Sequence, residues 1–200
     1  MPGPLHGVRV IDLTSMVSGP ATTMVLADQG ADVIKVENPA AGGDHTRVVS
    51  KSGEGLAASF LNNNRNKRSI TIDLKKPEGL PALLRLIEGA DVLVQNFRPG
   101  VAERIGVGEA AVRERAPEII YTSITGFGFT GPYAAKPVYD PLIQALSGLA
   151  SIQAGSDEDR PRLVRTILPD KLTGAVASQA ITAALYAREK TGQGQAIHLS

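Results

Sequence analysis

Residues 8–37, VRVIDLTSMVSGPATTMVLADQGADVIKVE, contain two short apolar runs separated by a stretch with helical character. The runs VRVIDL (8–13) and ADVIKVE (31–37) have the length and the β-branched content of buried strands. Between them, Gly19-Pro20 favours the start of a helix, because proline is tolerated in the first helical turn, and Gly30 favours its end. The segment therefore predicts a strand–helix–strand unit, the building block of a parallel sheet.

The same alternation continues to the end of the chain. Further strands are predicted at SITIDL (69–74), DVLVQNF (91–97), EIIYTSITGF (118–127), RLVRTI (162–167) and AIHLS (196–200). Helices are predicted at 76–90, 140–150 and 170–190, with two short helical pieces flanking Gly106. Strands separated by helices form a parallel sheet covered on both sides. We expect an α/β fold: a Rossmann-like, doubly wound, mostly parallel sheet with helices on both faces.

Length and charge limit the classes of function. The chain has 200 residues, with 21 basic and 20 acidic side chains, so its formal charge is only +1. A near-neutral chain argues against nucleic-acid and membrane-surface binding. It contains no cysteine, which excludes disulfides and thiolate metal sites. The N-terminus lacks a signal-peptide pattern, and the longest weakly polar run, AVASQAITAALYA, is too short and too polar to span a bilayer. We expect one sizeable cytoplasmic domain.

The stretch NNNRNKRSITIDLKK (62–76) concentrates asparagines and basic side chains just before and after a strand. One interpretation is a solvated loop. The other is a set of donors for an anionic ligand, because Arg65, Lys67 and Arg68 are suited to phosphate or carboxylate. A second donor set, Asn96, Arg98 and Arg104, follows the strand at 91–97. Strand ends of a doubly wound sheet converge on one crevice, so the two sets together predict a site for a small phosphorylated ligand.

A nicotinamide or flavin site is the first alternative for such a fold. Glu37, at the end of the second strand, occupies the place of a ribose-binding acid. The preceding turn, TSMVSGPATT, has one glycine and a proline where the G-x-G-x-x-G fingerprint is needed. The turn therefore argues against this kind of site.

Asp170 precedes the longest predicted helix and has two compatible interpretations. As an N-cap it would accept amide hydrogen bonds and interact favourably with the helix dipole. The same position would keep its carboxylate ionised, as a carboxylate nucleophile requires. The three histidines, His6, His45 and His198, are not grouped with carboxylates at ligand spacing, so we assign no metal site. No G-x-S-x-G nucleophile elbow is present.

Several of these motifs, in order, resemble one enzyme family. They are PLHGVRVIDLTSMVSGPATTMVLADQGADVIKVENP, NNNRNKRSITIDLKKPEG, ADVLVQNFRPG, TGFGFTGPY with YDPLIQALSGL, and DKLTGAVASQAITAALYAREKTGQGQ. Together they closely resemble the class III CoA-transferases, the formyl-CoA transferase and CaiB/BaiF group, over essentially the whole chain. The resemblance implies transfer of CoA from an acyl-CoA to a free carboxylic acid, without a permanently bound cofactor and without a metal.

The resemblance also implies roles for particular residues. Asp170 matches the catalytic aspartate, which attacks the thioester to give an aspartyl anhydride and then an aspartyl-CoA thioester. Arg65, Lys67 and Arg68 are expected to contribute field or structural hydrogen bonds instead of direct contacts. The residues implied in binding coenzyme A are Ser18, Ile72, Asp73, Leu74, Lys75, Asn96, Phe97, Arg98, Arg104 and Lys136.

The chain departs from the family at several points. Val17 and Asn38 stand where formate-handling members carry glutamine and arginine, which weakens a formyl or oxalyl assignment. The sequence ends inside its last predicted strand, so we expect residues 1–200 to be the N-terminal part of the large domain. The small domain and the C-terminal return would then lie outside this chain, and the full-length protein would be an interlocked homodimer.

Two rival functions remain open. The first is an α-methylacyl-CoA racemase of the same superfamily, whose members carry a histidine just before the aspartate corresponding to Asp140. No histidine occurs between 46 and 197, so a general base at that place is missing. The second is a CoA-binding fragment without catalytic activity.

Overall fold

The computed structural model describes residues 2–49 and 56–200. Within them one sheet has six strands in the order β3-β2-β1-β4-β5-β6, and each neighbouring pair is parallel. The strands are β1 (Arg9–Asp12), β2 (Asp32–Glu37), β3 (Lys67–Thr71), β4 (Val92–Gln95), β5 (Ile120–Ile124) and β6 (Ala196–Leu199). The chain thus winds outward from β1 in both directions, which confirms the doubly wound α/β prediction.

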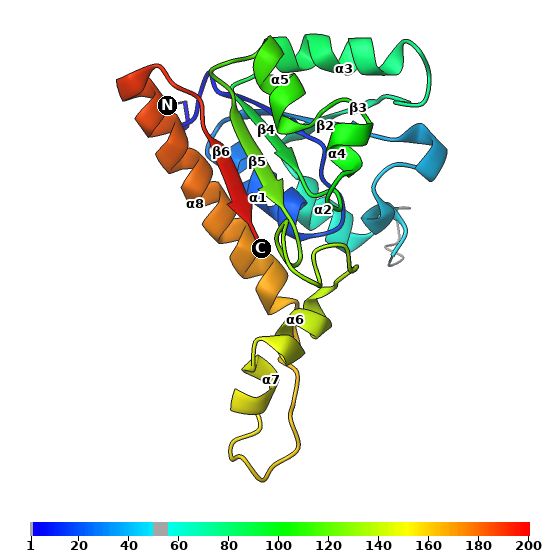
Figure 1. The fold of residues 1–200 in the computed structure, drawn as a ribbon, viewed down its shortest axis with the longest axis vertical. Coiled ribbons are helices and arrows are strands. Elements are labelled where there is room, and N and C mark those ends of the chain that lie inside the picture. The colour runs from blue at the N-terminus through cyan, green and yellow to red at the C-terminus, as the bar shows by residue number, and fades with distance from the viewer. Residues whose placement is uncertain (1, 50–55) are drawn as a thin grey trace.

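Helices cover both faces of this sheet (Figure 1). They are α1 (Ser18–Asp28), α2 (Ala58–Asn64), α3 (Gly79–Glu88), α4 (Val101–Arg104), α5 (Glu109–Arg115), α6 (Asp140–Leu146), α7 (Leu149–Ile152) and α8 (Leu168–Thr191). Two short 3-10 turns, η1 (Pro39–Ala41) and η2 (His45–Arg47), follow β2. Residues from α1 and α8 join one hydrophobic cluster, and residues from α3, α4 and α5 join the other.

The central strand explains why its sequence is apolar without interruption. Val10 packs into the cluster with Leu26 of α1 and Ile181 of α8, whereas Ile11 packs into the opposite cluster with Leu83 of α3. Successive side chains of a strand point to opposite faces, and here both faces are covered by helices. The sheet therefore has a hydrophobic core on each face.

A lobe formed by residues 140–167, called the α6–α7 lobe below, extends beyond that edge (Figure 1). The predicted strand at 162–167 lies in this lobe and is wrong, because the segment is irregular. Its amides have other partners: Arg162 N donates to the carbonyl of Ala150, and Val164 N donates to Gln144 Oε1. Backbone groups satisfied in this way cannot join a sheet.

Several predicted boundaries also move. The third strand is Lys67–Thr71 in place of 69–74; the asparagines at 62–64 belong to α2, and Asn66 lies in the turn between the two elements. The predicted helix at 140–150 is divided into α6 and α7 at Gly148, whose φ of 80° favours glycine. The last helix begins at Leu168, two residues before Asp170.

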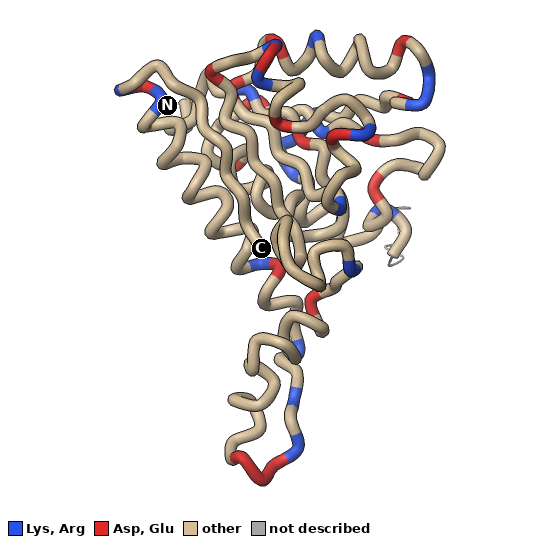
Figure 2. The backbone as a smooth tube through the Cα atoms, viewed as in Figure 1, with Lys and Arg blue, Asp and Glu red and all other residues tan. Residues whose placement is uncertain are grey.

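The long helix α8 has charged residues only toward its two ends, where the tube in Figure 2 is blue or red. Its central part packs on α1 through small and aliphatic residues such as Gly174, Ala177 and Ile181. Among the described residues, no helix combines the length and the apolar character needed to cross a membrane.

Candidate active site

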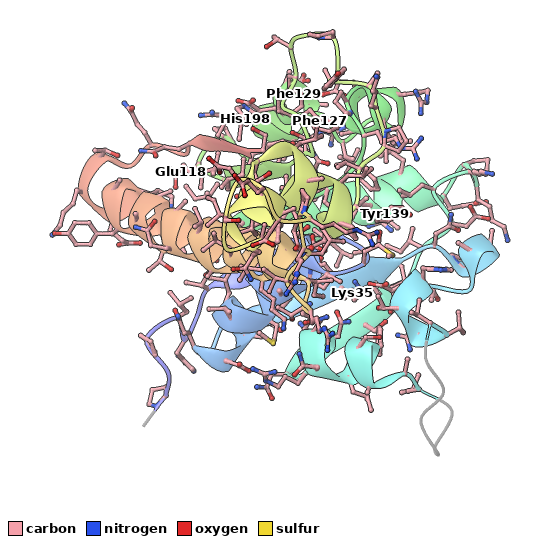
Figure 3. All side chains as sticks on the ribbon, turned by 90° about the horizontal axis from the view of Figure 1, so that it is seen from below. Lys35, Glu118, Phe127, Phe129, Tyr139 and His198 are labelled. Atoms are coloured by element: carbon pink, nitrogen blue, oxygen red, sulfur yellow. The ribbon has the colours of Figure 1, made fainter. Side chains whose placement is uncertain are left out.

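A pocket of about 740 Å³ lies at the C-terminal edge of the sheet, where the β1–α1 turn, the ends of β4 and β5, the α6–α7 lobe and the start of α8 meet. Figure 3 views the molecule from this end, with the α6–α7 lobe in front of the sheet. Six of the residues predicted for the site line this pocket: Ser18, Asn96, Phe97, Arg98, Lys136 and Asp170. The strand ends thus converge as a doubly wound sheet requires.

Asp170 is half-buried in the first turn of α8 and faces this pocket. The N-cap interpretation is wrong, because Ile167 is the N-cap residue and Asp170 lies three positions inside the helix. Its amide donates a hydrogen bond of 3.1 Å to Asp140 Oδ2, on α6. A carboxylate from another element therefore takes the place of a side-chain cap at this helix terminus.

The Asp140 carboxylate belongs to a buried polar network. Asp140 is 4% exposed and its Oδ1 accepts a hydrogen bond of 2.6 Å from Gln144 Nε2. The Gln144 amide also donates to the carbonyl of Thr166 and accepts from Val164 N. The network ties the irregular segment that leaves the α6–α7 lobe to the start of α8.

The environment of Asp170 disfavours its charged form. Burial raises the pKa of the Asp170 carboxyl, the nearby negative charge of Asp140 raises it further, and hydrogen bonding with the Ser18 side chain acts in the opposite direction. A raised carboxyl pKa in a pocket is a frequent property of functional groups.

Close packing of two helices places Ser18 next to Asp170. Gly174 lies one turn after Asp170, and a Cβ added there would be 2.9 Å from Ala21 Cβ and 3.4 Å from the carbonyl oxygen of Ser18. Glycine therefore allows α8 to approach the first turn of α1. The small residues of the long predicted helix serve this packing.

Asn96 lines the pocket, but its side chain is engaged by the backbone. Asn96 Oδ1 accepts a hydrogen bond of 3.0 Å from Ser15 N, and Asn96 Nδ2 donates one of 2.8 Å to Ser15 O. The side-chain amide thus joins the end of β4 to the β1–α1 turn. Phe97 and Arg98, which follow it, line the same pocket.

The basic cluster at 65–68 faces structural carboxylates instead of the pocket. Arg65 pairs with Asp28, Lys67 with Asp12 at 3.0 Å, and Arg68 with Asp32 at 2.7 Å. Asn64 Oδ1 accepts from Lys67, and Asn66 donates to Asp28. The interpretation of these residues as phosphate donors is therefore wrong, and the interpretation as structural hydrogen bonds is confirmed.

Other basic residues near the strand ends lack such partners. Across residues 2–49 and 56–200, the ion pairs include neither Arg98 and Arg104 nor Lys75 and Lys136. Lys136 Nζ lies 4.2 Å from the centre of the Tyr133 ring. Positive charge therefore remains available on the side of the sheet where the pocket opens.

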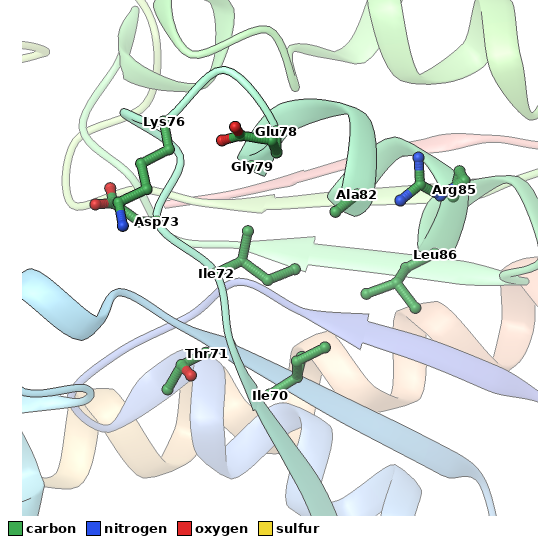
Figure 4. Close-up of a pocket in the computed structure, with 10 residues that line it drawn as sticks. All are labelled: Ile70, Thr71, Ile72, Asp73, Lys76, Glu78, Gly79, Ala82, Arg85 and Leu86. Carbon is green, nitrogen blue, oxygen red and sulfur yellow. The ribbon is translucent and has the colours of Figure 1, made fainter.

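The remaining predicted ligand contacts lie outside the main pocket. Ile72 and Asp73 line a second pocket of about 500 Å³ between β3 and α3 (Figure 4). Leu74, Lys75 and Arg104 line neither of these two pockets. The structure therefore brings together about half of the predicted site.

Glu37 has a structural role in place of ribose binding. Arg47 Nε donates to Glu37 Oε2 at 2.8 Å, and Ser69 Oγ donates to Glu37 Oε1 at 2.6 Å. Burial raises the pKa of Glu37, but the hydrogen bonds from Arg47, Ser69 and the Asp44 amide lower it to about 2. A dinucleotide ribose would have to displace these donors.

No metal cluster is formed by the described residues. His198 Nε2 lies 3.6 Å from Glu109 Oε2, and its ring packs edge-on against Phe129. His6 lies at the opposite end of the sheet, in a pocket with Arg9 and Asp32.

Three features of the site were not predicted as parts of it: Tyr139, the Asp140–Gln144 network, and the turn residues Ser15 and Met16. The signal for Asp140 and Gln144 was their spacing of four residues on one helix, which lets their side chains meet. The turn carries no composition signal, because its geometry comes from distant side chains.

Comparisons with known proteins agree over nearly the whole chain. The family model described as CoA-transferase family III matches residues 5–200. A succinate–glutarate CoA-transferase of Agrobacterium fabrum is 44% identical over 98% of this chain and 50% of its own length. The human succinyl-CoA:glutarate CoA-transferase is 43% identical over 96% of this chain and 43% of its own length. The crystal structure of a CaiB/BaiF family protein from Brucella suis has a TM-score of 0.92 at 40% identity and covers 98% of this chain and 53% of that one. The chain spans about half the length of these relatives.

Proposed function

Because the chain belongs to CoA-transferase family III, we propose that the whole protein moves coenzyme A from an acyl-CoA thioester to a free carboxylic acid. The observation that carries this proposal is the position of Asp170. Its carboxylate lies in a 740 Å³ pocket together with the end of β4 and with Lys136. This arrangement supports the proposal that a nucleophile and an acyl-CoA binding surface meet at one edge of the sheet.

In the proposed reaction, a carboxylate oxygen of Asp170 attacks the thioester carbonyl and expels CoA as a thiolate, leaving an acyl–aspartyl anhydride. The thiolate attacks the aspartyl carbonyl of this anhydride, which releases the donor acid and leaves an aspartyl-CoA thioester. The acceptor carboxylate then attacks the thioester carbonyl and again expels the thiolate. Attack of the thiolate on the acceptor carbonyl gives the new acyl-CoA and regenerates Asp170. No redox change occurs, and the charge is balanced at each step.

The surroundings of Asp170 suit this role. The N-terminus of α8 favours negative charge, and Ser18 offers a hydrogen bond to the carboxylate. Asp140 and burial act in the other direction and keep the anion poorly stabilised. A carboxylate that is ionised but poorly stabilised is a stronger nucleophile than one in a tight ion pair.

Available positive charge supports binding of the CoA phosphates. Arg98 and Lys136 line the pocket, and Arg104 and Lys75 are exposed near the same edge. All four lie outside the ion pairs found among the described residues, whereas the arginines at 65 and 68 are paired. We propose that these unpaired cations bind the phosphates and that Ile72, Asp73 and Leu74 contact the nucleotide.

The racemase alternative is less well supported by the same pocket. Tyr139 precedes Asp140 at the place where a racemase would carry its histidine. Asp140 itself accepts hydrogen bonds from the amide of Asp170 and from Gln144. Both features favour a structural role over a proton-transfer role for this part of the pocket.

We further propose that residues 1–200 are part of a large domain and that the complete protein is a cytoplasmic homodimer. The chain covers only about half of the length of its relatives, which supports the proposal that it is part of a larger domain. Apolar side chains exposed on α6 and α8, such as Leu142, Leu146 and Leu172, support the proposed homodimer, because a buried interface would cover them. The succinate, glutarate and oxalate in the names of the relatives suggest small carboxylic acids as substrates.

The test is intact-protein mass spectrometry of the full-length protein incubated with a panel of acyl-CoA thioesters and trapped with hydroxylamine or borohydride. We expect a trapped product on the peptide containing Asp170 in the wild type and none in Asp170→Ala, while Asp170→Ala still binds CoA. Solvent deuterium entering the acyl α-carbon without an adduct would replace the proposal with the racemase. If the protein binds CoA but shows neither a trapped adduct nor deuterium exchange, it would be a CoA-binding protein without catalytic activity.

A further inference from the structure

The β1–α1 turn, residues 14–16, has an unusual backbone. Met16 has a φ of 71°, although it is not a glycine. Such a conformation costs free energy in a residue with a side chain and persists only where the surroundings impose it. The turn lines the active-site pocket through Ser15 and Met16 and leads directly into Ser18.

Side chains from four other places bind the backbone of this turn. Asp12 Oδ1 accepts from Thr14 N at 2.9 Å, and Lys35 Nζ donates to Thr14 O at 2.8 Å. Asn96 bonds both backbone groups of Ser15. Asp44 Oδ1 accepts from Met16 N at 3.3 Å. Three of these four side chains are distant from the turn along the chain, so its geometry depends mainly on residues outside its own sequence.

Lys35 is the least expected member of this set. Its side chain is 1% exposed, and its ammonium lies 2.9 Å from Asp44 Oδ2, whose side chain is equally buried. Lys35 extends from β2 toward the C-terminal edge, and Figure 3 labels it there. Burying such a pair brings little net stability compared with apolar residues of similar size. A role in fixing the conformation of the turn would explain why a buried ion pair occurs at this place.

We propose that Lys35, together with Asp44, is a positioning residue for the transferase reaction: the pair holds residues 14–16 in the conformation that presents Ser18 to Asp170. The inference rests on the proposed function and adds to it a residue that does not touch the reacting atoms. Loss of the pair would release the Thr14 carbonyl and would leave the side chain at position 44, the acceptor for Met16 N, without its anchor, so the turn would relax from its positive φ. Ser18 would then move away from the carboxylate.

The first test uses Lys35→Met with Asp44→Asn in the full-length protein. This double variant removes both charges together, so no unpaired charge remains buried, and the asparagine still offers an acceptor to Met16 N. The matched control is Arg188→Met with Asp91→Asn, which removes a pair of 2.8 Å at the opposite end of the sheet. Both double variants are expected to lower the melting temperature.

Only the Lys35 double variant should slow the chemistry. We expect its rate of trapped acyl–Asp170 formation at saturating acyl-CoA to fall about tenfold or more, because a small misplacement of a reacting group is costly. The KM for acyl-CoA should stay within about threefold, since the phosphate-binding residues are unchanged. Equal rates in the variant and the wild type, or an equal loss in the Arg188 control, would overturn the inference.

Combination with Ser18→Ala gives a readout that a general loss of stability would not affect. If the pair acts through Ser18, the combined variant should lose less activity than the product of the two separate losses. Fully independent effects would contradict this route. Should the Lys35 double variant fail to fold, Asn96→Ala removes the other support of the turn at a less buried place. It should show the same fall in rate and the same dependence on Ser18.

The two levels of the proposal fail in different ways. Wild-type protein that forms no adduct with any acyl-CoA would refute the proposed function. Wild-type protein that forms the adduct, alongside a Lys35 double variant of unchanged rate, would refute only the positioning role.

Discussion

Two carboxylates with different surroundings meet at the start of α8. Both line the pocket, but Asp140 is only 4% exposed and is hydrogen-bonded to Gln144, whereas Asp170 is half-buried. Because burial and then Asp140 raise the pKa of Asp170, its carboxylate, the proposed nucleophile, becomes protonated on acidification at a higher pH than a free aspartate does.

In Asp140→Asn, the fall of kcat/KM on the acidic side of the pH profile, its acidic limb, should therefore occur at lower pH than in the wild type. The substitution removes the nearby negative charge, so the pKa of Asp170 falls and the anion persists to more acidic conditions. The measurement is kcat/KM against pH for full-length wild type and variant, because this profile reports groups of the free enzyme. Asp159→Asn makes the same change in net charge at an exposed place in the lobe and should leave the limb unmoved. A limb that moves upward in Asp140→Asn would contradict this account of Asp170.

Removing an arginine that lies outside the ion pairs and removing one that is ion-paired should have different effects on the affinity for CoA. Arg104→Ala is expected to weaken CoA binding roughly tenfold, since a hydrogen bond to a charged group contributes about 1.5–3 kcal/mol. Arg65→Ala, which removes a guanidinium paired with Asp28, should leave the affinity for CoA unchanged. Calorimetric titration with CoA and with dephospho-CoA measures both. Equal losses for the two ligands in Arg104→Ala would place this arginine away from the 3′-phosphate.

The residue types of the site could be predicted from the sequence better than their partners. Asp170, Ser18 and Lys136 were predicted for the site through a family resemblance and share one pocket. The partners of Arg65 and Lys67 could not be predicted, because Asp28 and Asp12 are far away along the chain. A local excess of positive charge in the sequence becomes a set of internal ion pairs once the sheet is assembled.

At the scale of elements, the contact between α1 and α8 brings the first turn of α1 close to Asp170. Gly174 permits this contact, and its neighbours on α1 are Ala21 Cβ and the backbone of Ser18 and Thr22. The helix pair therefore acts as a rigid support for the site, in addition to covering one face of the sheet.

Gly174→Ala should push the two helices apart. Alanine normally stabilises a helix relative to glycine, but here its Cβ would meet Ala21, and overpacking costs about 1–3 kcal/mol. We expect a lower melting temperature and a slower acylation step. The combination with Ala21→Gly removes the opposing methyl group and should restore part of both losses. Thermal denaturation and the kinetics of adduct formation measure these effects. If the double variant is no more stable and no faster than Gly174→Ala, the contact between Gly174 and Ala21 would be unimportant.

Element types were predicted more reliably than element ends. The strands β1, β2, β4, β5 and β6 lie inside their predicted ranges, because buried parallel strands have near-continuous apolar sequences. The segment at 162–167 has a similar apolar pattern but is not a strand, since Gln144 and Ala150 take its amides. Periodicity alone does not show which partner satisfies a backbone group.

At the scale of the whole molecule, buried carboxylates should control stability in acid. Burial raises the pKa of Asp12, but Lys67 and Lys35, with hydrogen bonds from Thr14 and Thr23, lower it to about 2. A lowered pKa means that the stabilisation is present above the unfolded value of 3.8 and is lost as the pH falls toward 2. Glu37, with a pKa of about 2, acts in the same direction.

We therefore expect the free energy of unfolding to decline between about pH 4 and pH 2. Urea denaturation at a series of pH values measures this decline in the full-length protein. Asp12→Asn should be less stable at neutral pH and should show a shallower decline in acid, because the group responsible has been removed. Asp157→Asn, at an exposed site in the lobe, should follow the wild type. An unchanged slope in Asp12→Asn would assign the acid sensitivity to other carboxylates.

The order of the strands also has a consequence for biosynthesis. The pairing of Tyr121 with Ala196 joins β5 to β6 only after the intervening chain, including α6 and α8, has been made. Until then the face of α1 that later contacts α8 is uncovered on the nascent chain, and parallel pairings between distant segments form slowly. Ribosome-bound chains that end before α8 should therefore attract holding chaperones, and the binding should cease once β6 has emerged from the exit tunnel.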